Sequence, residues 1–215
     1  RPPRSTLFPY TTLFRSTYDK DEMYSEWAPN EKVAMEVAIG ASFHGVRAMA
    51  SMKHVGVNVA SDPLYTIAYS GVNGGLVIVA ADDPGLYSSQ NEQDSRMVAR
   101  AAMVPVIEPS DSEEARVFTK RAFELSEKYD TPVMLRTTTR LAHSQCIVNL
   151  EERVQIEDKP YVKNIAKNVM MPAMAKARHL IVEQRMQKMS EDGYDLDINK
   201  VEYNDKKVGV ITSGI

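Results

Sequence analysis

The most constraining feature of this 215-residue sequence is a continuous apolar run, Leu-Val-Ile-Val-Ala-Ala, at residues 76–81. Two glycines precede the run, and the turn-forming sequence Asp-Asp-Pro-Gly follows it at residues 82–85. A strand with apolar side chains on both faces is typical of a parallel sheet that helices cover on both sides. The run therefore predicts a strand of an α/β fold.

Segments with helical and strand character alternate on both sides of this run. Helices are predicted at residues 30–42, 62–69, 93–102 and 111–129, and strands at residues 47–53, 104–107 and 131–135. Asn30 is the expected N-cap of the first helix, and Ser-Asp-Ser-Glu at residues 110–113 resembles a capping box. This alternation predicts βαβ units and a doubly wound, mostly parallel sheet.

The chain divides into four segments with different expected roles. Residues 1–16 repeat Thr-Leu-Phe without a helical or strand period, and we interpret them as a non-native segment that resembles translated sequencing adapter; a transit peptide is the alternative. Residues 17–145 are expected to form an α/β domain that lacks its N-terminal part. Residues 146–205 are expected to be a linker with one helix at residues 173–189. Residues 206–215 would begin a truncated second α/β domain with a buried strand, so we interpret the chain as an interior fragment.

Composition excludes several classes of protein. Hydrophobic residues make up 43% and charged residues 26% of the chain, as in ordinary globular proteins. A net charge of -3 and a pI of about 5.9 argue against a surface for nucleic acid or anionic membranes. No apolar run approaches the roughly 20 residues that span a bilayer. The single cysteine, Cys146, allows neither an internal disulfide nor a cysteine-ligated metal cluster and suits a reducing cytosol.

Polar segments follow three of the predicted strands, at the edge of the sheet where doubly wound folds bind ligands. The candidate residues in these segments are Lys53 and His54, then Ser89, Gln90, Asn91 and Asp94, and finally Arg140 and His143. Each segment also has a structural interpretation. Residues 82–85 suit a turn, residues 89–94 suit a solvated loop that leads to a helix cap, and both histidines suit partly buried, hydrogen-bonded positions.

Common ligand-binding motifs are missing from the sequence. An acidic pattern at residues 195–206 is not an EF-hand, because Lys200 and Lys206 occupy the positions of the required glycine and glutamate. The phosphate-binding loop, the nucleophile elbow and the dinucleotide fingerprint are also absent. These absences disfavour nucleotide kinases, α/β hydrolases and nicotinamide dehydrogenases.

The first predicted helix resembles the glutamate helix of the pyrimidine-binding domain in thiamine-diphosphate enzymes. Its pattern Glu-x-x-Ala-x-x-x-Ala-x-Gly is matched by Glu31, Ala34, Ala38 and Gly40. The segments at residues 52–64, 74–85, 88–94 and 131–140 resemble, in order, the alpha subunits of indolepyruvate:ferredoxin oxidoreductases, within the thiamine-diphosphate-dependent 2-oxoacid:ferredoxin oxidoreductase family. The likeness is looser at residues 160–164 and returns at residues 209–215.

This resemblance implies oxidative decarboxylation of aryl pyruvates such as indolepyruvate to aryl-acetyl-CoA, with ferredoxin as the electron acceptor. It implies thiamine diphosphate with Mg²⁺, 4Fe-4S clusters, coenzyme A, a beta subunit as partner and a cytoplasmic location. The metal and diphosphate ligands and the cluster cysteines would lie outside this chain, so we expect the fragment to be inactive alone. A non-oxidative thiamine-diphosphate decarboxylase and a non-catalytic subunit-docking α/β domain are the alternatives.

The resemblance also implies roles for individual residues. Glu31 would be catalytic, because a carboxyl group hydrogen-bonded to N1′ of the pyrimidine favours the imino tautomer that acts as base. Ala34 and Gly56 would contact the cofactor. Lys53 and His54 would bind the carboxylate or carbonyl oxygen of the substrate. Contacts to substrate, coenzyme A or a partner domain are implied for Ser89, Gln90, Asn91 and Asp94, whereas Arg140 and His143 match the family pattern without a derived role.

Overall fold

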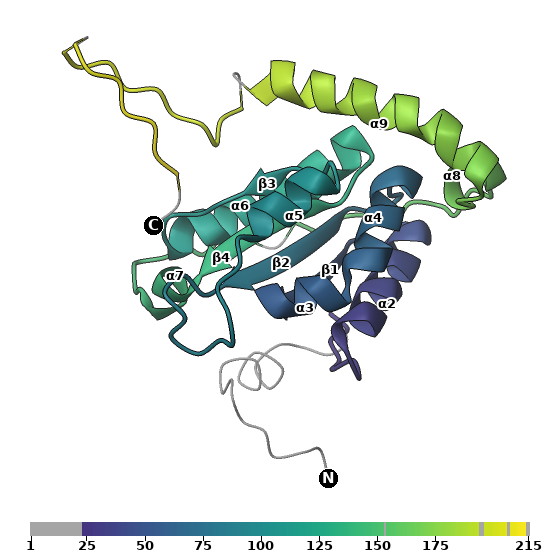
Figure 1. Cartoon of the computed structure of the whole chain (residues 1–215), viewed down its shortest axis with the longest axis horizontal. Coiled ribbons are helices and arrows are strands. Elements are labelled where there is room, and N and C mark those ends of the chain that lie inside the picture. The colour runs from purple at the N-terminus through teal and green to yellow at the C-terminus, as the bar shows by residue number, and fades with distance from the viewer. Residues whose placement is uncertain (1–22, 153, 194–195, 206, 214–215) are drawn as a thin grey trace.

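The computed structural model describes residues 23–152, 154–193, 196–205 and 207–213, so the adapter-like segment lies outside the described residues. Its centre is a four-stranded sheet in the order β1-β2-β4-β3 (Figure 1). The strands are β1 (Ala48–Lys53), β2 (Leu76–Asp82), β3 (Val106–Ile107) and β4 (Val133–Thr138). Every neighbouring pair is parallel, so all four strands end at the same edge of the sheet. The predicted parallel α/β fold is confirmed.

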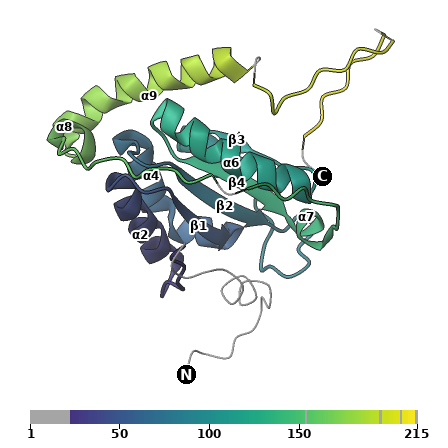
Figure 2. The same cartoon turned by 180° about the vertical axis from the view of Figure 1, so that it is seen from behind.

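Helices cover both faces of this sheet, as a doubly wound fold requires. The helices α2 (Glu31–Phe43), α3 (His54–Val59), α4 (Ser61–Ser70) and α5 (Ser95–Ala101) pack on one face, and α6 (Ser112–Tyr129) packs on the other (Figures 1 and 2). Ile78 belongs to the core beneath the first group, whereas its neighbour Val77 belongs to the core beneath α6. The apolar run is therefore buried on both faces because successive strand side chains point in opposite directions.

Three of these helices begin at polar caps, which are Asn30 for α2, Asp94 for α5 and Asp111 for α6. Asn30 accepts a hydrogen bond from the amide of Val33 at 3.0 Å, as expected. The capping box proposed at residues 110–113 is wrong by one residue. Asp111 has the extended backbone of an N-cap and accepts from the amide of Glu114 at 2.8 Å, while the Glu114 carboxylate accepts from the amide of Ser110 at 2.8 Å.

Short helices occur where the sequence predicted only loops. They are α3, α7 (Thr139–His143) and α8 (Ile165–Asn168), with six, five and four residues. Segments of this length are too short to show an apolar period, so pattern analysis cannot detect them. The first two follow β1 and β4 directly, which places them at the ligand-binding edge of the sheet.

The long helix α9 (Pro172–Asp192) contains the helix predicted at residues 173–189 and packs on the α/β domain. Two buried arginines of α9 hold it there: Arg178 Nε donates to the carbonyl of Tyr69 at 2.7 Å, and Arg185 Nη2 donates to that of Ala68 at 2.8 Å. These carbonyls lie in the last turn of α4, where cationic side chains are favourable. None of the helices in the described ranges is both long enough and apolar enough to cross a membrane.

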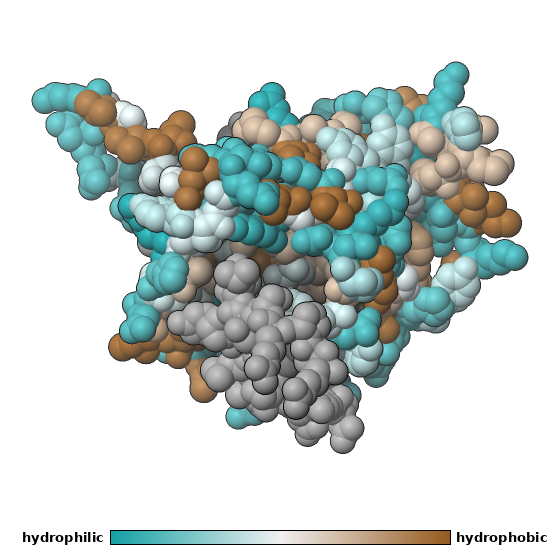
Figure 3. Space-filling model, turned by 60° about the horizontal axis from the view of Figure 1, so that its bottom comes forward, coloured by the Kyte–Doolittle hydropathy of each residue, from teal (hydrophilic) through white to brown (hydrophobic). Residues whose placement is uncertain are grey.

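The segment at residues 207–213 does not form the predicted buried strand. It pairs with none of the four strands of the sheet, and its apolar residues Val208, Val210 and Ile211 are exposed. Figure 3 shows apolar side chains standing out on the segment that follows α9. Strand structure requires a neighbouring strand to supply hydrogen bonds, and the described part of the chain provides none at this position.

Candidate functional site

Glu31 and Gly56 meet beside the carboxyl end of β1. Glu31 occupies the first turn of α2, and Gly56 lies in α3. A Cβ atom at position 56 would lie 2.6 Å from Cγ and 3.0 Å from Oε1 of Glu31, so only glycine allows this approach. No group within the described ranges donates a hydrogen bond to the half-buried Glu31 carboxylate. Ala34 follows one turn later on the same face of α2 and adds a small side chain.

This arrangement fits the pyrimidine ring of thiamine diphosphate. A carboxylate with free acceptor positions is what a protonated ring nitrogen or an amino group of a ligand requires. The close packing on Gly56 fixes the Glu31 side chain from one side. The two residues come from helices on either side of β1 in the sequence, and only the fold brings them together.

The loop that follows β2 is organised by a carboxylate that the sequence analysis treated as turn chemistry. Asp83 accepts hydrogen bonds from the amide of Ser88 at 2.8 Å, from Ser89 Oγ at 2.5 Å and from Thr139 Oγ1 at 2.8 Å. These hydrogen bonds, with that from Ser89 the strongest, hold the pKa of Asp83 well below its usual range. The hydroxyl of Ser89 is therefore engaged within the loop.

Lys53 and His54 face this loop as well. Lys53 Nζ donates to the carbonyl of Ser88 at 2.6 Å, and His54 Nε2 hydrogen-bonds to the carbonyl of Asn91 at 3.1 Å. His54 is only 1% exposed. The expectation of a partly buried, hydrogen-bonded histidine holds for His54. Both side chains already have backbone partners, so contacts with a substrate carboxylate would have to replace or add to these hydrogen bonds.

A buried charge cluster lies at the carboxyl ends of β2, β3 and β4, and the sequence analysis did not identify it. Arg136 Nε donates to Asp82 at 2.6 Å, and its Nη1 donates to Glu108. Asp94 caps α5 and pairs with Arg96 at 2.8 Å, an interaction that lowers the pKa of Asp94. The available signal was Arg136 itself, since it follows the apolar run Val-Met-Leu at residues 133–135 directly and a charge buried there requires a partner.

A cavity of about 580 Å³ opens beside this cluster. Its walls are formed by Pro84, Glu92, Gln93, Asp94, Arg96, Arg136, Thr138 and Ser213. The carboxylates of Asp94 and Glu92 accompany the two arginines, and Asp82 and Glu108 lie behind Arg136. Acidic groups therefore outnumber basic ones around the cavity. This balance opposes the binding of an anion such as coenzyme A at Asp94.

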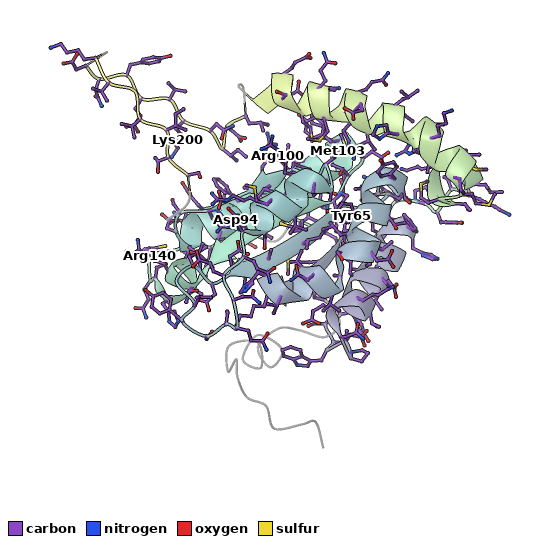
Figure 4. The ribbon with its side chains drawn as sticks, viewed as in Figure 1. Tyr65, Asp94, Arg100, Met103, Arg140 and Lys200 are labelled. Carbon is purple, nitrogen blue, oxygen red and sulfur yellow. The ribbon has the colours of Figure 1, made fainter. Side chains whose placement is uncertain are left out.

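Several candidate residues lie apart from these groups. Gln90 is exposed on the loop, and Arg140 and His143 are exposed on α7. Figure 4 shows Arg140 at the outer edge of the molecule, apart from Asp94. The structural interpretation of His143 as a partly buried histidine is wrong, because α7 turns this side chain towards solvent. Cys146 is exposed, and no group of three acidic, histidine or cysteine side chains in the described ranges could hold a metal ion.

Comparison with known proteins identifies the family. A sequence profile described as "Pyruvate flavodoxin/ferredoxin oxidoreductase, thiamine diP-bdg" matches residues 3–210. The chain belongs to this family. As a member of the pyruvate flavodoxin/ferredoxin oxidoreductase family, it contains the region that the profile describes as thiamine-diphosphate-binding.

Curated relatives agree with this assignment. The chain is 45% identical over 203 residues to an indolepyruvate oxidoreductase subunit IorA of Archaeoglobus fulgidus, covering 91% of this chain and 32% of the relative. It is 46% identical over 200 residues to the subunit of the same name from Pyrococcus abyssi, covering 90% of this chain and 31% of the relative. The chain thus spans about a third of the length of these relatives.

A solved structure shares the fold. The 2-oxoglutarate:ferredoxin oxidoreductase of Magnetococcus marinus, determined with 2-oxoglutarate, coenzyme A and succinyl-CoA bound, superimposes with a TM-score of 0.59 at 17% identity. The match covers 84% of this chain and 38% of that chain. The chain therefore shares its parallel sheet with helices on both faces with this enzyme.

Proposed function

We propose that this chain forms the aminopyrimidine-binding side of a thiamine-diphosphate-dependent 2-oxoacid:ferredoxin oxidoreductase that acts on aryl pyruvates such as indolepyruvate. The reaction is oxidative decarboxylation to an aryl-acetyl-CoA, with ferredoxin as the electron acceptor. The observation that carries the proposal is the carboxylate of Glu31, which receives no hydrogen bond from the described residues and is held against Gly56 in a member of this family. The names of the curated relatives support the choice of substrate class.

Thiamine diphosphate supplies the nucleophilic carbon and the electron sink that decarboxylation of a 2-oxoacid requires. The carboxyl group of Glu31 would hold the ring nitrogen N1′ and would give or take a proton there, which is general acid–base work by a placed carboxyl group. Ala34 and Gly56 keep large side chains away from Glu31. Their small size would leave room for apolar ring surface in place of water beside the carboxylate, which would strengthen its hydrogen bond to the ring.

The remaining components of this activity belong to the proposed whole protein. They are Mg²⁺ and its diphosphate ligands, 4Fe-4S clusters, a beta subunit, ferredoxin and coenzyme A. We propose that residues 17–145 form the pyrimidine-binding domain, with α9 packed against it. The fragment alone is expected neither to reduce ferredoxin nor to bind thiamine diphosphate tightly.

The test is Glu31→Gln in the full-length protein assembled with its beta subunit. Loss of the acidic proton is expected to lower indolepyruvate-dependent reduction of ferredoxin by roughly 10²- to 10⁴-fold, the usual contribution of general acid–base catalysis. Glu36→Gln is the matched control, because Glu36 lies on the same helix with its side chain 53% exposed. Near wild-type turnover of Glu31→Gln would support a docking domain, and release of an aldehyde in place of aryl-acetyl-CoA would support a non-oxidative decarboxylase.

A further inference from the structure

Helix α3 lies between Glu31 and the loop at residues 84–94. On one side, Gly56 of α3 contacts the Glu31 side chain. On the other side, three side chains at or next to α3 bond to the loop. Lys53 Nζ donates to the carbonyl of Ser88 at 2.6 Å, and His54 Nε2 bonds to the carbonyl of Asn91 at 3.1 Å. The third is Asn58 Nδ2, which donates to Gln93 Oε1 at 2.8 Å.

Of the three side chains that bond to the loop, His54 has the least freedom to move. Its side chain is buried, whereas Asn58 is exposed and its partner Gln93 lies on the surface. A carbonyl oxygen only accepts hydrogen bonds, so Nε2 of His54 must carry the hydrogen. The other ring nitrogen, Nδ1, is buried without a partner in the described part of the chain. Among the described residues, the carbonyl of Asn91 is therefore the one hydrogen-bond partner of this buried ring, and this bond ties α3 to the loop.

The far side of the loop is fixed independently. Asp83 binds the amide of Ser88 and the hydroxyl of Ser89, and Thr139 of α7 binds Asp83. The loop is therefore held between two anchors, and of these two, within the described residues, the α3 anchor alone also touches Glu31. Because α3 is a single short helix, a displacement at Gly56 moves His54, two residues earlier, in the same direction.

We propose that His54 is a positioning residue that couples the loop at residues 84–94 to Glu31 through α3. Binding of thiamine diphosphate at Glu31 orders the loop, and the loop in turn restrains Glu31. We propose this role for His54 in place of the direct contact with a substrate carboxylate that the family resemblance implied. It rests on the proposed function, because the ligand at Glu31 is the cofactor of that function.

The experiment is hydrogen exchange, read by mass spectrometry, on the full-length protein with and without thiamine diphosphate and Mg²⁺. In wild type, the cofactor is expected to slow exchange at residues 31–36 and at residues 86–92. His54→Phe keeps the ring volume and removes the link, so the cofactor should protect residues 31–36 alone. With the cofactor bound, the loop of His54→Phe should then exchange about tenfold faster than the wild-type loop, as expected for one lost hydrogen bond. His54→Gln offers an amide donor at the place of Nε2 and should restore the response of the loop.

Two further variants control the interpretation. His143→Phe makes the same substitution at an exposed histidine and should behave as wild type. Lys53→Met removes the neighbouring link without touching the buried ring, and should weaken the loop response even where His54→Phe fails to fold. A purely structural His54 would raise exchange equally with and without the cofactor.

The outcomes separate this proposal from the function on which it rests. Cofactor-dependent protection of the loop that persists in His54→Phe would overturn the coupling. Wild-type protection at residues 31–36 without protection of the loop would also overturn it, and would leave the proposed function standing. Absence of protection at residues 31–36 in wild type would overturn the proposed function, and the coupling with it.

Discussion

The side chain of Glu31 packs directly on the α-carbon of Gly56, where a Cβ atom would lie 2.6 Å from Glu31 Cγ. This contact joins the first turn of α2 to the middle of α3. It leaves the carboxylate without a hydrogen-bond donor from the described residues. The position of the candidate catalytic group therefore depends on the absence of a side chain at position 56.

Gly56→Ala is accordingly expected to displace Glu31 and to lower the affinity of the full-length protein for thiamine diphosphate by at least about tenfold, which corresponds to roughly 1.4 kcal/mol. Calorimetric titration with the cofactor and Mg²⁺ measures this change. Gly40→Ala is the control, since a Cβ at Gly40 of α2 meets no atom within 4 Å. That control should bind normally and gain up to about 1 kcal/mol of helix stability. Equal affinities for the two variants would show that the Gly56 contact does not position Glu31.

Arg136→Met is expected to destabilise the chain by about 3–5 kcal/mol, because it leaves the carboxylates of Asp82 and Glu108 buried without their main partner. Urea unfolding monitored by circular dichroism measures this loss. Arg140→Met provides the comparison, since Arg140 is exposed on α7 and should change stability by less than about 0.5 kcal/mol. A similar loss of unfolding free energy for both variants would contradict the conclusion that the charge cluster around Arg136 stabilises the fold.

Glu127 should make stability depend on pH in the acid range. It accepts hydrogen bonds from Arg47 Nε at 2.9 Å and the amide of Gly75 at 3.1 Å. Burial alone would raise the pKa of Glu127, but hydrogen bonds from Arg47, Lys159 and Gly75 lower it to about 2. Because this folded value lies below the ordinary value of 4.5, the unfolded chain binds the proton more tightly. The stabilisation is complete above pH 4.5 and is lost as the pH falls towards 2.

Glu127→Gln should therefore be less stable than wild type at neutral pH, and the difference should shrink as the pH falls below 4.5. Urea midpoints measured from pH 3 to pH 7 follow this change. Glu124→Gln alters a more exposed carboxylate of the same helix, paired with Arg121, and should leave the pH profile unchanged. Parallel profiles for wild type and Glu127→Gln would refute the assigned pKa shift.

Arg185→Met should weaken the attachment of α9. Arg185 Nη1 donates to the carbonyl of Asp130 at 2.8 Å and Nη2 donates to that of Ala68 at 2.8 Å, and burial lowers the pKa of Arg185 to about 10. Loss of these charged donors is expected to cost roughly 2–3 kcal/mol. Limited proteolysis within α9 should accelerate with it, while Lys176→Met at an exposed position of α9 should have no effect. Unchanged proteolysis would mean that other contacts hold the helix.

The alternation of segments with strand character and segments with helical character was sufficient to predict the parallel sheet and its main helices. The run at residues 76–81 became β2, and Asn30 caps α2 as predicted, whereas the helix predicted at residues 93–102 begins only at Ser95, after its cap Asp94. These features depend on local periodicity and on side-chain to backbone hydrogen bonds within a few residues, which the order of amino acids contains directly. The candidate residues after the strands were likewise found because parallel strands end at one edge.

The relations among those residues were decided by tertiary structure alone. Sequence could select Glu31 and Gly56 separately, but their contact arises because α2 and α3 flank the same strand. Arg136 and its acidic partners come from three strand ends, so no local pattern joins them. The exposed segment at residues 207–213 makes the same point in reverse: its sequence resembles a buried strand, yet a strand forms only where another chain segment supplies hydrogen bonds and apolar cover.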